Sequence, residues 1–181
     1  MIDIGGGLVL RPWEARDAGA VLAAFAAPEM GRQADEPINS LADAGRWIAR
    51  RAADREADVA YAFAVADAGD GAALGNVAVS AVNRTHDVGW VSYWTAPQAR
   101  GRGVASRGCA ALAQWAFGEL GLFRLELGHR VNNPASCAVA RAAGFVVEGV
   151  QRQKLAYDGV RYDVELHARL ASDGRAGVAR P

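Results

Sequence analysis

Apolar and polar positions along the chain predict an alternation of strands and helices. In the first half, the expected elements are a strand at 8–11, a helix at 16–26, a helix from 40 to about 54, and strands at 61–66, 74–83 and 88–95. Ser40 precedes the second helix, where its hydroxyl can accept a backbone N–H of the first turn. The turn Gly69-Asp70-Gly71 joins two of the strands as a hairpin.

The second half continues the alternation. Its expected elements are a helix after Gly103 to about 120, a short strand at 123–127, a helix that begins at Asn133-Pro134 and ends before Gly144, and two strands around Asp158-Gly159. The last strand alternates strictly, with Tyr162, Val164, Leu166, Ala168 and Leu170 on one face and Arg161, Asp163, Glu165, His167 and Arg169 on the other. One mixed sheet with helices on both faces accommodates this order.

The 181 residues are expected to form a single domain with its core at about 8–170. The glycine-rich start and the tail at 171–181 are typical of frayed ends, and the tail is expected to be flexible. Hydrophobic residues make up 51% and charged residues 22%, which excludes wholesale disorder. Lys plus Arg equals Asp plus Glu at 20 each, which argues against nucleic acid or an anionic membrane as partner.

The two cysteines, Cys109 and Cys137, indicate neither a disulfide framework nor a metal centre, and small core or near-core positions are expected for both. We expect no metal, because candidate ligands are not clustered in the sequence. The start does not resemble a signal peptide, and no window approaches the ~20 apolar residues of a membrane span. A cytoplasmic location is therefore the expectation.

The segment from Tyr93 to Ala105 is the most informative of the chain, because a strand passes through Gly101 and Gly103 directly into a helix. Such a turn leaves backbone N–H groups unpaired at the positive end of a helix dipole, which suits a pyrophosphate. Arg100 and Arg102 can add charge-assisted hydrogen bonds. A plain tight turn explains the glycines equally well. The chain lacks both the Walker A pattern and the G-x-G-x-x-G spacing.

Several motifs in order resemble the GNAT N-acetyltransferases, and in particular their RimJ/RimL-like branch. They are Leu8-Val9-Leu10-Arg11-Pro12 with Asp17, Tyr93-Trp94-Thr95-Ala96-Pro97, Gln98-x-x-Gly101-x-Gly103, Asn133-Pro134-Ala135-Ser136 with Ala143-Gly144-Phe145 and Glu148-Gly149, and Tyr157-Asp158-Gly159 through Asp163. The resemblance covers about residues 8–170. It implies an α/β (α+β) fold with one mixed, mostly antiparallel sheet, a splayed central strand pair and helices on both faces.

The resemblance also implies acetyl-CoA as co-substrate and a primary amine as acceptor, with direct attack in a ternary complex. Pantetheine would lie between strands 88–95 and 123–129, and the phosphates on the glycine turn. The residues implied in cofactor binding are Trp94, Thr95, Gln98, Arg100, Gly101, Arg102, Gly103, Val104, Ala105, Ser106, Asn133 and Ser136. Ser136 would also be catalytic, as proton donor to the departing thiolate. Asn133 and Ser136 equally suit a helix start, where they can simply cap backbone amides.

No residue stands out as the general base. His86, His129 and His167 are the only histidines; His129 would lie near the amine, although a histidine beside an arginine is typical of a surface. Glu126 and Glu148 are alternatives. Trp90 stands where many relatives carry an acidic residue and Leu155 where some carry a glutamate, so a water relay or a partly neutral amine can replace a dedicated base.

The acceptor pocket is expected between the first two helices, their connecting loop and the last hairpin. Glu29, Asp35 and Glu36 of that loop can attract a cationic amine or simply be solvated, and Trp13 and Trp47 either line the pocket or pack in the core. A protein N-terminus, an aminoglycoside-like amine, a polyamine and an amino-acid analogue all stay open. Alternatives to the enzyme are a non-catalytic acyl-CoA-binding module and an interaction domain. A homodimer is compatible with the family.

Overall fold

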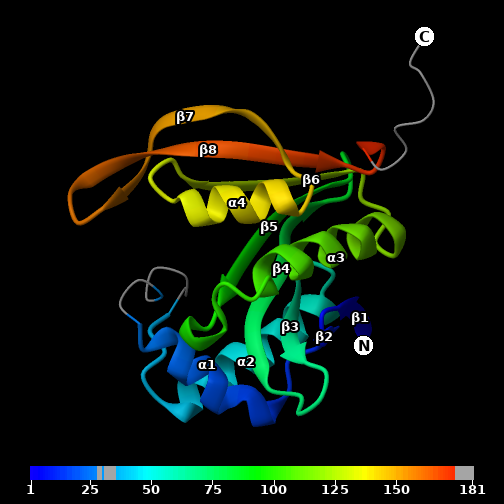
Figure 1. The fold of residues 1–181 in the computed structure, drawn as a ribbon, viewed down its shortest axis with the longest axis vertical. Helices are drawn as coiled ribbons and strands as arrows, with labels where there is room; N and C mark the ends of the chain where they lie inside the picture. Colours follow the sequence, from blue (N-terminus) through cyan, green and yellow to red (C-terminus); the bar gives the residue numbers. More distant parts are fainter. Residues whose placement is uncertain (28–29, 31–35, 174–181) are drawn as a thin grey trace.

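All strands of the computed structural model, which describes residues 1–27, 30 and 36–173, form one eight-stranded sheet in the order β1-β2-β3-β4-β5-β6-β8-β7 (Figure 1). The strands are β1 (Ile2–Gly5), β2 (Leu8–Arg11), β3 (Tyr61–Asp67), β4 (Ala73–Asn83), β5 (Val88–Thr95), β6 (Arg124–Arg130), β7 (Val146–Tyr157) and β8 (Val160–Leu170). Only β5 and β6 pair in parallel. The mixed, mostly antiparallel sheet expected from the sequence is confirmed.

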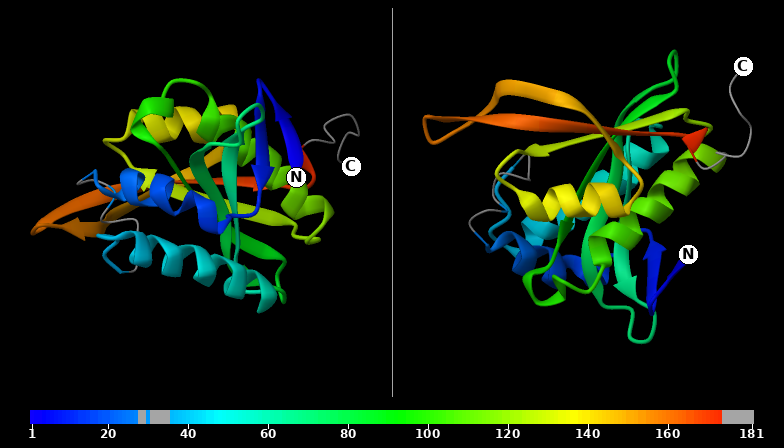
Figure 2. Two further views of the ribbon diagram at one scale, coloured as in Figure 1. Left: turned by 90° about the horizontal axis from the view of Figure 1, so that it is seen from below. Right: turned by 45° about the horizontal axis from the view of Figure 1, so that its top comes forward.

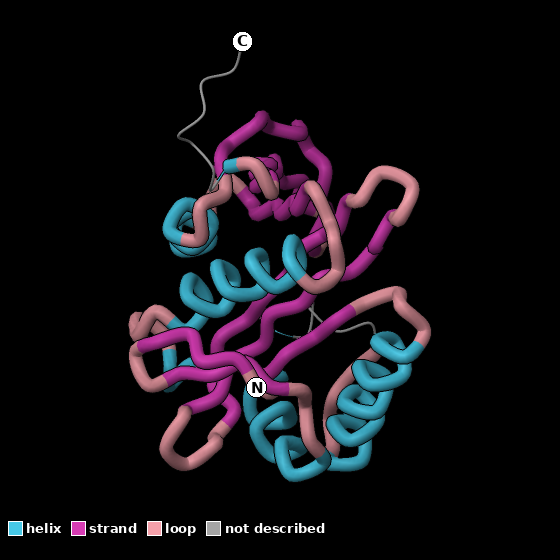
Figure 3. The backbone as a smooth tube through the Cα atoms, turned by 90° about the vertical axis from the view of Figure 1, so that its right-hand side faces the viewer, coloured by secondary structure: helices cyan, strands magenta, loops and turns pink. Residues whose placement is uncertain are grey.

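Helices cover both faces of the sheet, as expected. They are η1 (Ala15–Asp17), α1 (Ala18–Phe25), α2 (Leu41–Glu56), η3 (Pro97–Ala99), α3 (Val104–Gly118) and α4 (Pro134–Ala142). The helices α1 and α2 pack on one face and α3 and α4 on the other, each pair over its own hydrophobic core (Figure 2). Figure 3 looks at the sheet from its β1 edge, with helices on either side. None of these helices is long and apolar enough to cross a membrane.

The start of the chain forms a strand, so the expectation of a frayed N-terminal end is wrong. β1 pairs antiparallel with β2, with Ile2 opposite Leu10, and Ile2 and Ile4 pack against the α3-side core. The three glycines at 5–7 all have a positive φ, between 65° and 74°, which a tight turn can demand and glycine adopts without strain. Four residues with two isoleucines are too short for periodicity to reveal.

The other end of the chain stays attached to the sheet for a few residues beyond β8. The N–H of Ala171 donates to the carbonyl of Phe123 at 2.8 Å, and the N–H of Leu170 donates to the Asp173 carboxylate at 2.8 Å. The rest of the tail expected to be flexible, residues 174–181, lies outside the described residues.

The face of β8 expected to be polar lies beneath α4. His167 on this face is 1% exposed, and the Arg169 guanidinium donates to the carbonyl of Ala143 at the end of α4, at 2.8 Å. Both faces of β8 are therefore covered in part, which strict alternation in the sequence does not indicate.

The strands β5 and β6 part after three residue pairs, which confirms the expected splay. The pairs are Val88–Arg124, Gly89–Leu125 and Trp90–Glu126. Beyond them β5 continues along β4 and β6 continues along β8, so that β5 visibly runs away from β6 in Figure 1. A bulge in β4, where Ala81 has a φ of 48°, lies opposite the last paired residues of β5. Bulges bend a strand and increase its twist, which helps β5 to turn away.

A cluster of four aromatic side chains holds the far half of β5 against α1 and α2. The Trp94 ring lies 5.7 Å from the Trp13 ring and 5.8 Å from the Phe25 ring, and Trp47 completes the cluster. Trp13 also donates its indole N–H to Asn76 Oδ1 at 3.0 Å. Contacts between aromatic rings stabilise a fold by more than the apolar area that they bury. Trp13 is therefore a core residue, and Trp47 packs against the same core.

A buried ion pair between Arg11 and Asp17 fixes the start of the α1 side. Its two hydrogen bonds are 2.7 and 2.8 Å long, and the residues are 3% and 5% exposed. Arg11 also donates to the carbonyl of Gly71 at 2.7 Å, and Asp17 accepts the N–H of Glu14 at 2.9 Å. The pair thereby ties β2 to η1 and to the β3–β4 turn. This is the structural role of the arginine and aspartate in the first motif of the sequence.

Replacement of Asp17 by alanine should lower the free energy of unfolding by about 3–5 kcal/mol, because it leaves the Arg11 charge buried without a partner. Urea unfolding followed by circular dichroism measures this. The double variant Arg11→Met with Asp17→Leu should lose much less, since it removes both charges. Equal losses in the two variants would contradict an electrostatic cause.

The same ion pair should make the free energy of unfolding depend on pH in the acidic range. Burial raises the pKa of Asp17, but the hydrogen bonds from Arg11 and the Glu14 N–H outweigh it, and the net pKa is lowered. The stabilisation is therefore complete above the ordinary aspartate pKa of about 3.9 and is lost as the pH falls through the lowered folded-state pKa. Unfolding measured from neutral to acidic pH should show a shallower loss in Asp17→Asn than in the wild type.

Candidate active site

A cleft of about 700 Å³ lies where β5 and β6 have parted. Its wall includes β5, the turn before α3, the first turn of α3 and one side of α4. Ten of the twelve residues expected to bind the cofactor line it: Trp94, Thr95, Arg100, Gly101, Gly103, Val104, Ala105, Ser106, Asn133 and Ser136. The fold thus brings together two motifs that lie about thirty residues apart in the sequence.

The other two predicted residues, Gln98 and Arg102, are not part of this wall. Gln98 is exposed in η3. The Arg102 guanidinium lies 3.9 Å from the Asp67 carboxylate, and its side chain is 56% exposed. The charge expected from Arg102 is therefore directed toward the β3–β4 hairpin in this structure.

The start of α3 presents backbone N–H groups to the cleft. The first hydrogen bond of the helix runs from the N–H of Arg107 to the carbonyl of Gly103 at 3.0 Å, so the preceding N–H groups have no partner within the helix. Gly101 and Gly103 have φ values of 76° and 75°, in the region that favours glycine. This arrangement of N–H groups at the positive end of a helix suits an anion.

Arg107 is a cation beside this helix start that sequence reasoning did not single out. A Cβ atom on Gly103 would lie 3.3 Å from its Nε and one on Gly6 would lie 2.8 Å from its Cζ, so the guanidinium lies between the glycine turn and the β1–β2 turn, outside the cleft wall. Its position one turn into α3 is the only signal in the sequence, and many surface arginines share it.

The opposite wall carries Asn133 and Ser136. Asn133 Oδ1 accepts the N–H of Ser136 at 3.1 Å, so the expected cap is present and both residues also face the cleft. The Tyr93 hydroxyl donates to the carbonyl of Ser136 at 3.1 Å, which connects β5 to α4 across the opening. Burial raises the pKa of Tyr93 to about 12, so the hydroxyl keeps its proton. Tyr93 begins the motif Tyr93-Trp94-Thr95-Ala96-Pro97, but nothing in the sequence indicates this hydrogen bond.

Two of the candidate general bases lie at the closed end of the strand pair. Arg124 donates to Glu126 at 2.6 Å and to Glu148 at 2.9 Å. These hydrogen bonds lower the pKa of Glu148. Neither glutamate lines the cleft. His86 is exposed on the β4–β5 turn, also away from the cleft.

His129 is buried, so the surface position considered typical for it is wrong. It is 7% exposed beneath α4, where its Nε2 lies 2.9 Å from Nε2 of His167. Its neighbour Arg130 lines the cleft, whereas His129 faces away from it into the layer between sheet and α4.

Trp90 and Leu155, which stand where relatives carry acidic residues, lie on the strands β5 and β7 of the sheet. The Trp90 indole lies over Gly128, where an added Cβ would come within 3.1 Å of the ring, and Lys154 Nζ lies 5.5 Å from the ring centre. Trp90 therefore spans β5 and β6 just where they part. Leu155 is half-buried on β7, opposite Tyr162 of β8.

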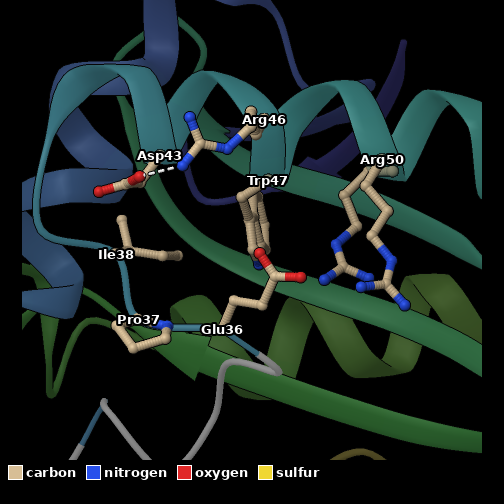
Figure 4. Close-up of a pocket in the computed structure, with 8 residues that line it drawn as sticks. Glu36, Pro37, Ile38, Asp43, Arg46, Trp47 and Arg50 are labelled. Carbon is tan, nitrogen blue, oxygen red and sulfur yellow. Dashed lines mark hydrogen bonds and ion pairs between the residues drawn. The ribbon is translucent and has the colours of Figure 1, made fainter.

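Two smaller pockets lie on the α2 side, where the acceptor was expected. One of about 250 Å³ is lined by Asp54, Asn76, Ser80 and Ser92, and shares Tyr93 and Trp94 with the cleft. The other, of about 220 Å³, is drawn in Figure 4: Arg46 and Arg50 extend from α2 on either side of Trp47, with Glu36 facing them. Arg51 lines both pockets.

The described part of this region is more basic than expected. Of the three loop acids, Glu29 and Asp35 lie outside the described residues, and Glu36 shares its pocket with three arginines. Arg46 also forms an ion pair with Asp43, and Arg51 with Asp54 at 3.3 Å. An attraction of Glu36 for a cationic amine is therefore opposed by its own neighbours.

Comparison with known proteins agrees with this geometry. Residues 7–146 match the family described as acetyltransferase (GNAT) domain. The chain belongs to the GNAT acetyltransferase family. The ribosomal-protein-serine acetyltransferase of Escherichia coli is 32% identical over 92 residues, which cover 51% of this chain and 50% of that protein. The segments matched in the first three curated relatives span 50 to 66% of their lengths.

Solved GNAT structures share the fold along nearly the whole chain. The structure of RimL, a ribosomal L7/L12 alpha-N-protein acetyltransferase in complex with coenzyme A, matches with a TM-score of 0.82 at 22% identity, over 93% of this chain and 97% of that one. The self-immunity acetyltransferase MccE, in complex with acetyl-CoA and AMP, matches with a TM-score of 0.79 at 19% identity, over 92% and 94%.

Replacement of Asn133 by alanine should lower the free energy of unfolding by about 1 kcal/mol, because the N–H of Ser136 loses its acceptor. Asn133→Asp should restore most of the loss, since aspartate is an equally good cap. The exposed neighbour Asn132→Ala is the matched control, and chemical denaturation gives the measurement. An unchanged stability in Asn133→Ala would show that the cap contributes nothing.

Proposed function

We propose that this protein transfers the acetyl group of acetyl-CoA to a primary amine by direct attack in a ternary complex. The observation that supports this most strongly is the cleft that leads from the start of α3 into the opening between β5 and β6. It combines an anion site with an unpaired strand edge, which are the two features that a diphosphate with an extended amide arm requires.

The residues present fit coenzyme A. The N–H groups at 104–106 would bind the pyrophosphate, with positive charge from Arg100 on the same wall. The pantetheine amides would pair with main-chain groups of Trp94 and Thr95, in the manner of an added strand. A volume of about 700 Å³ is in the range of small-molecule sites.

The thioester supplies the activated acyl group, and residues of this chain would donate and accept the protons that the reaction moves. The neutral amine attacks the carbonyl carbon, a C–N bond forms and the C–S bond breaks. In our proposal the Ser136 hydroxyl donates a proton to the departing thiolate and recovers one, through water, from the nitrogen that has become an amide. The bond from Tyr93 to the Ser136 carbonyl would hold this end of α4 in place. A solvent relay takes the part of a dedicated base.

The α2-side pockets lead us to propose an acceptor that is neutral or acidic near its amine, such as a protein N-terminus followed by acidic residues. Three arginines, Arg46, Arg50 and Arg51, line the pocket of Figure 4 together with two acids, Glu36 and Asp43, and the remaining excess of positive charge would disfavour a polyamine. The second pocket shares Tyr93 and Trp94 with the cleft, which is where an amine would have to reach the thioester.

Substitution of Gly103 by aspartate should weaken coenzyme A binding by about tenfold or more, because a carboxylate would compete with the phosphates at the helix start. Isothermal titration calorimetry with coenzyme A measures the affinity, and circular dichroism checks the fold. Gly118→Asp, at the exposed far end of the same helix, is the matched control and should bind like the wild type. A wild-type protein that gives no heat with coenzyme A would contradict the proposal.

Substitution of Ser136 by alanine should lower kcat by about 100-fold while coenzyme A affinity changes little, since a proton donor acts in the chemical step. The assay is thiol release from acetyl-CoA with a panel of amines that includes polyamines and N-terminal peptides of acidic, neutral and basic sequence. Ser106→Ala should affect coenzyme A affinity instead. An equal kcat in Ser136→Ala would remove this residue from the mechanism. Coenzyme A binding without turnover on any amine would favour a non-catalytic acyl-CoA-binding module.

A further inference from the structure

Four side chains from three elements converge beneath α4, outside the cleft. They are His129 of β6, Cys137 of α4, and Glu165 and His167 of β8. Their Nε2, Sγ, Oε1 and Nε2 atoms form the cluster: the candidate ligand atoms all lie within 4.8 Å of one another. The positions span 39 residues and lack the short spacings of zinc-binding motifs, so the sequence gives no sign of the cluster. In the folded structure the four side chains do come together, against the expectation from the sequence.

The distances between these atoms suit a shared metal ion. His129 Nε2 lies 2.9 Å from His167 Nε2 and 3.4 Å from Glu165 Oε1, and Glu165 Oε1 lies 2.9 Å from His167 Nε2 and 3.4 Å from Cys137 Sγ. Donors on a tetrahedral zinc ion lie about 3.3–3.7 Å apart, given bond lengths of about 2.0–2.3 Å. These four distances depart from that range by at most about 0.4 Å, and no pair of ligand atoms is more than 4.8 Å apart, so an ion would need to draw the farthest pair together by about one ångström at most.

The hydrogen bonds of the cluster indicate where its protons lie. Nδ1 of His129 lies 3.0 Å from the carbonyl of Arg130, which can only accept, so Nδ1 carries the proton and the lone pair of Nε2 points into the cluster. The Cys137 thiol donates to Glu165 Oε1 at 3.4 Å, and the proton of His167 Nε2 lies between His129 Nε2 and Glu165 Oε1, each 2.9 Å away. A metal ion would take the place of these two protons, since thiolate and imidazole bind a metal only once they are deprotonated.

His167 can release that proton without losing another contact. Its Nδ1 is buried and makes no hydrogen bond to the described residues, so the proton lies on Nε2 until a bound ion shifts it to Nδ1. With the proton on Nδ1, the Nε2 lone pairs of both rings converge with Glu165 and Cys137. The bond from His129 Nδ1 to a backbone carbonyl is the orienting contact that metal-bound histidines usually make.

We propose that His129, Cys137, Glu165 and His167 form a binding site for a divalent transition metal ion, with zinc the best match. Two imidazoles, one thiolate and one carboxylate are the donor types that zinc prefers, and four protein donors are typical of a closed, structural site. The histidines are 7% and 1% exposed, while Cys137 and Glu165 are half-buried and give the ion its access. This inference does not depend on the proposed transferase activity.

A bound ion would connect α4 to β6 and β8. Cys137 follows Ser136 directly in α4, and His129 precedes Arg130 of the cleft wall. The ion would therefore fix the position of one wall of the cleft while staying out of contact with the substrates.

The test uses the full chain without affinity-tag histidines, stripped with a chelator and titrated with Co²⁺. One equivalent should bind and give the visible bands of tetrahedral cobalt together with a thiolate-to-cobalt charge-transfer band, and Zn²⁺ should displace it. Zn²⁺ should also raise the Tm of the stripped protein with increasing concentration. Absence of stoichiometric binding of both ions would overturn the proposal.

Variants locate the site. Cys137→Ser should lose the charge-transfer band, and His129→Gln should lower the affinity for Co²⁺ at least tenfold. The matched controls are Cys109→Ser, whose sulfur is fully buried in the α3-side core, and the exposed His86→Gln; both should keep the wild-type spectrum. If His129→Gln fails to fold, Cys137→Ser at its half-buried position decides alone. A charge-transfer band that survives in Cys137→Ser would overturn the assignment.

Discussion

The early end of the pairing between β5 and β6 is the constraint on which the rest of the structure depends. Backbone groups that face an opened seam have to find partners in water or in a ligand, so the opening persists only because each strand is held firmly on its other side. β4 holds β5, and β8 holds β6. The bulge at Ala81 and the Trp90 ring over Gly128 both lie at the point of separation.

The molecule divides its stabilising contacts between the two halves that this opening separates. On the β5 side, the Trp94 cluster and the buried Arg11–Asp17 pair hold the strand and the α1 side together. On the β6 side, α4 packs on the sheet through both the apolar core around Ala140 and a polar layer of histidine, cysteine and glutamate. The hydrogen bond from Tyr93 to the Ser136 carbonyl is a direct link between the halves within the cleft.

The sequence predicted nearly all of the sheet, because β-branched alternation and glycine turns are local signals. Val88–Thr95 has the predicted limits, and Ser40 and Asn133 cap their helices as expected. β1 was missed because two isoleucines make no period, and the burial of His167 was missed because α4 covers the face of β8 that carries its polar residues. His129 continues the buried positions of Leu125 and Leu127 along β6, so strand alternation could have predicted its burial. The residues of the cleft could be predicted because they lie in the family motifs. The partners of Arg102 and Glu36 could not, because these partners, Asp67 and the arginines of α2, are distant in the sequence.

Trp94 illustrates a consequence of building a binding cleft along a strand edge. Its indole packs into the aromatic cluster on one side of the sheet, while its backbone borders the cleft. Peptide groups are common to every amino acid, so a surface that relies on them tolerates wide drift in side-chain identity as long as the strand keeps its path. Under the proposed function, selection could reshape the side chains of the α2-side pockets and so change the acceptor amine, while the backbone contacts to coenzyme A stay the same.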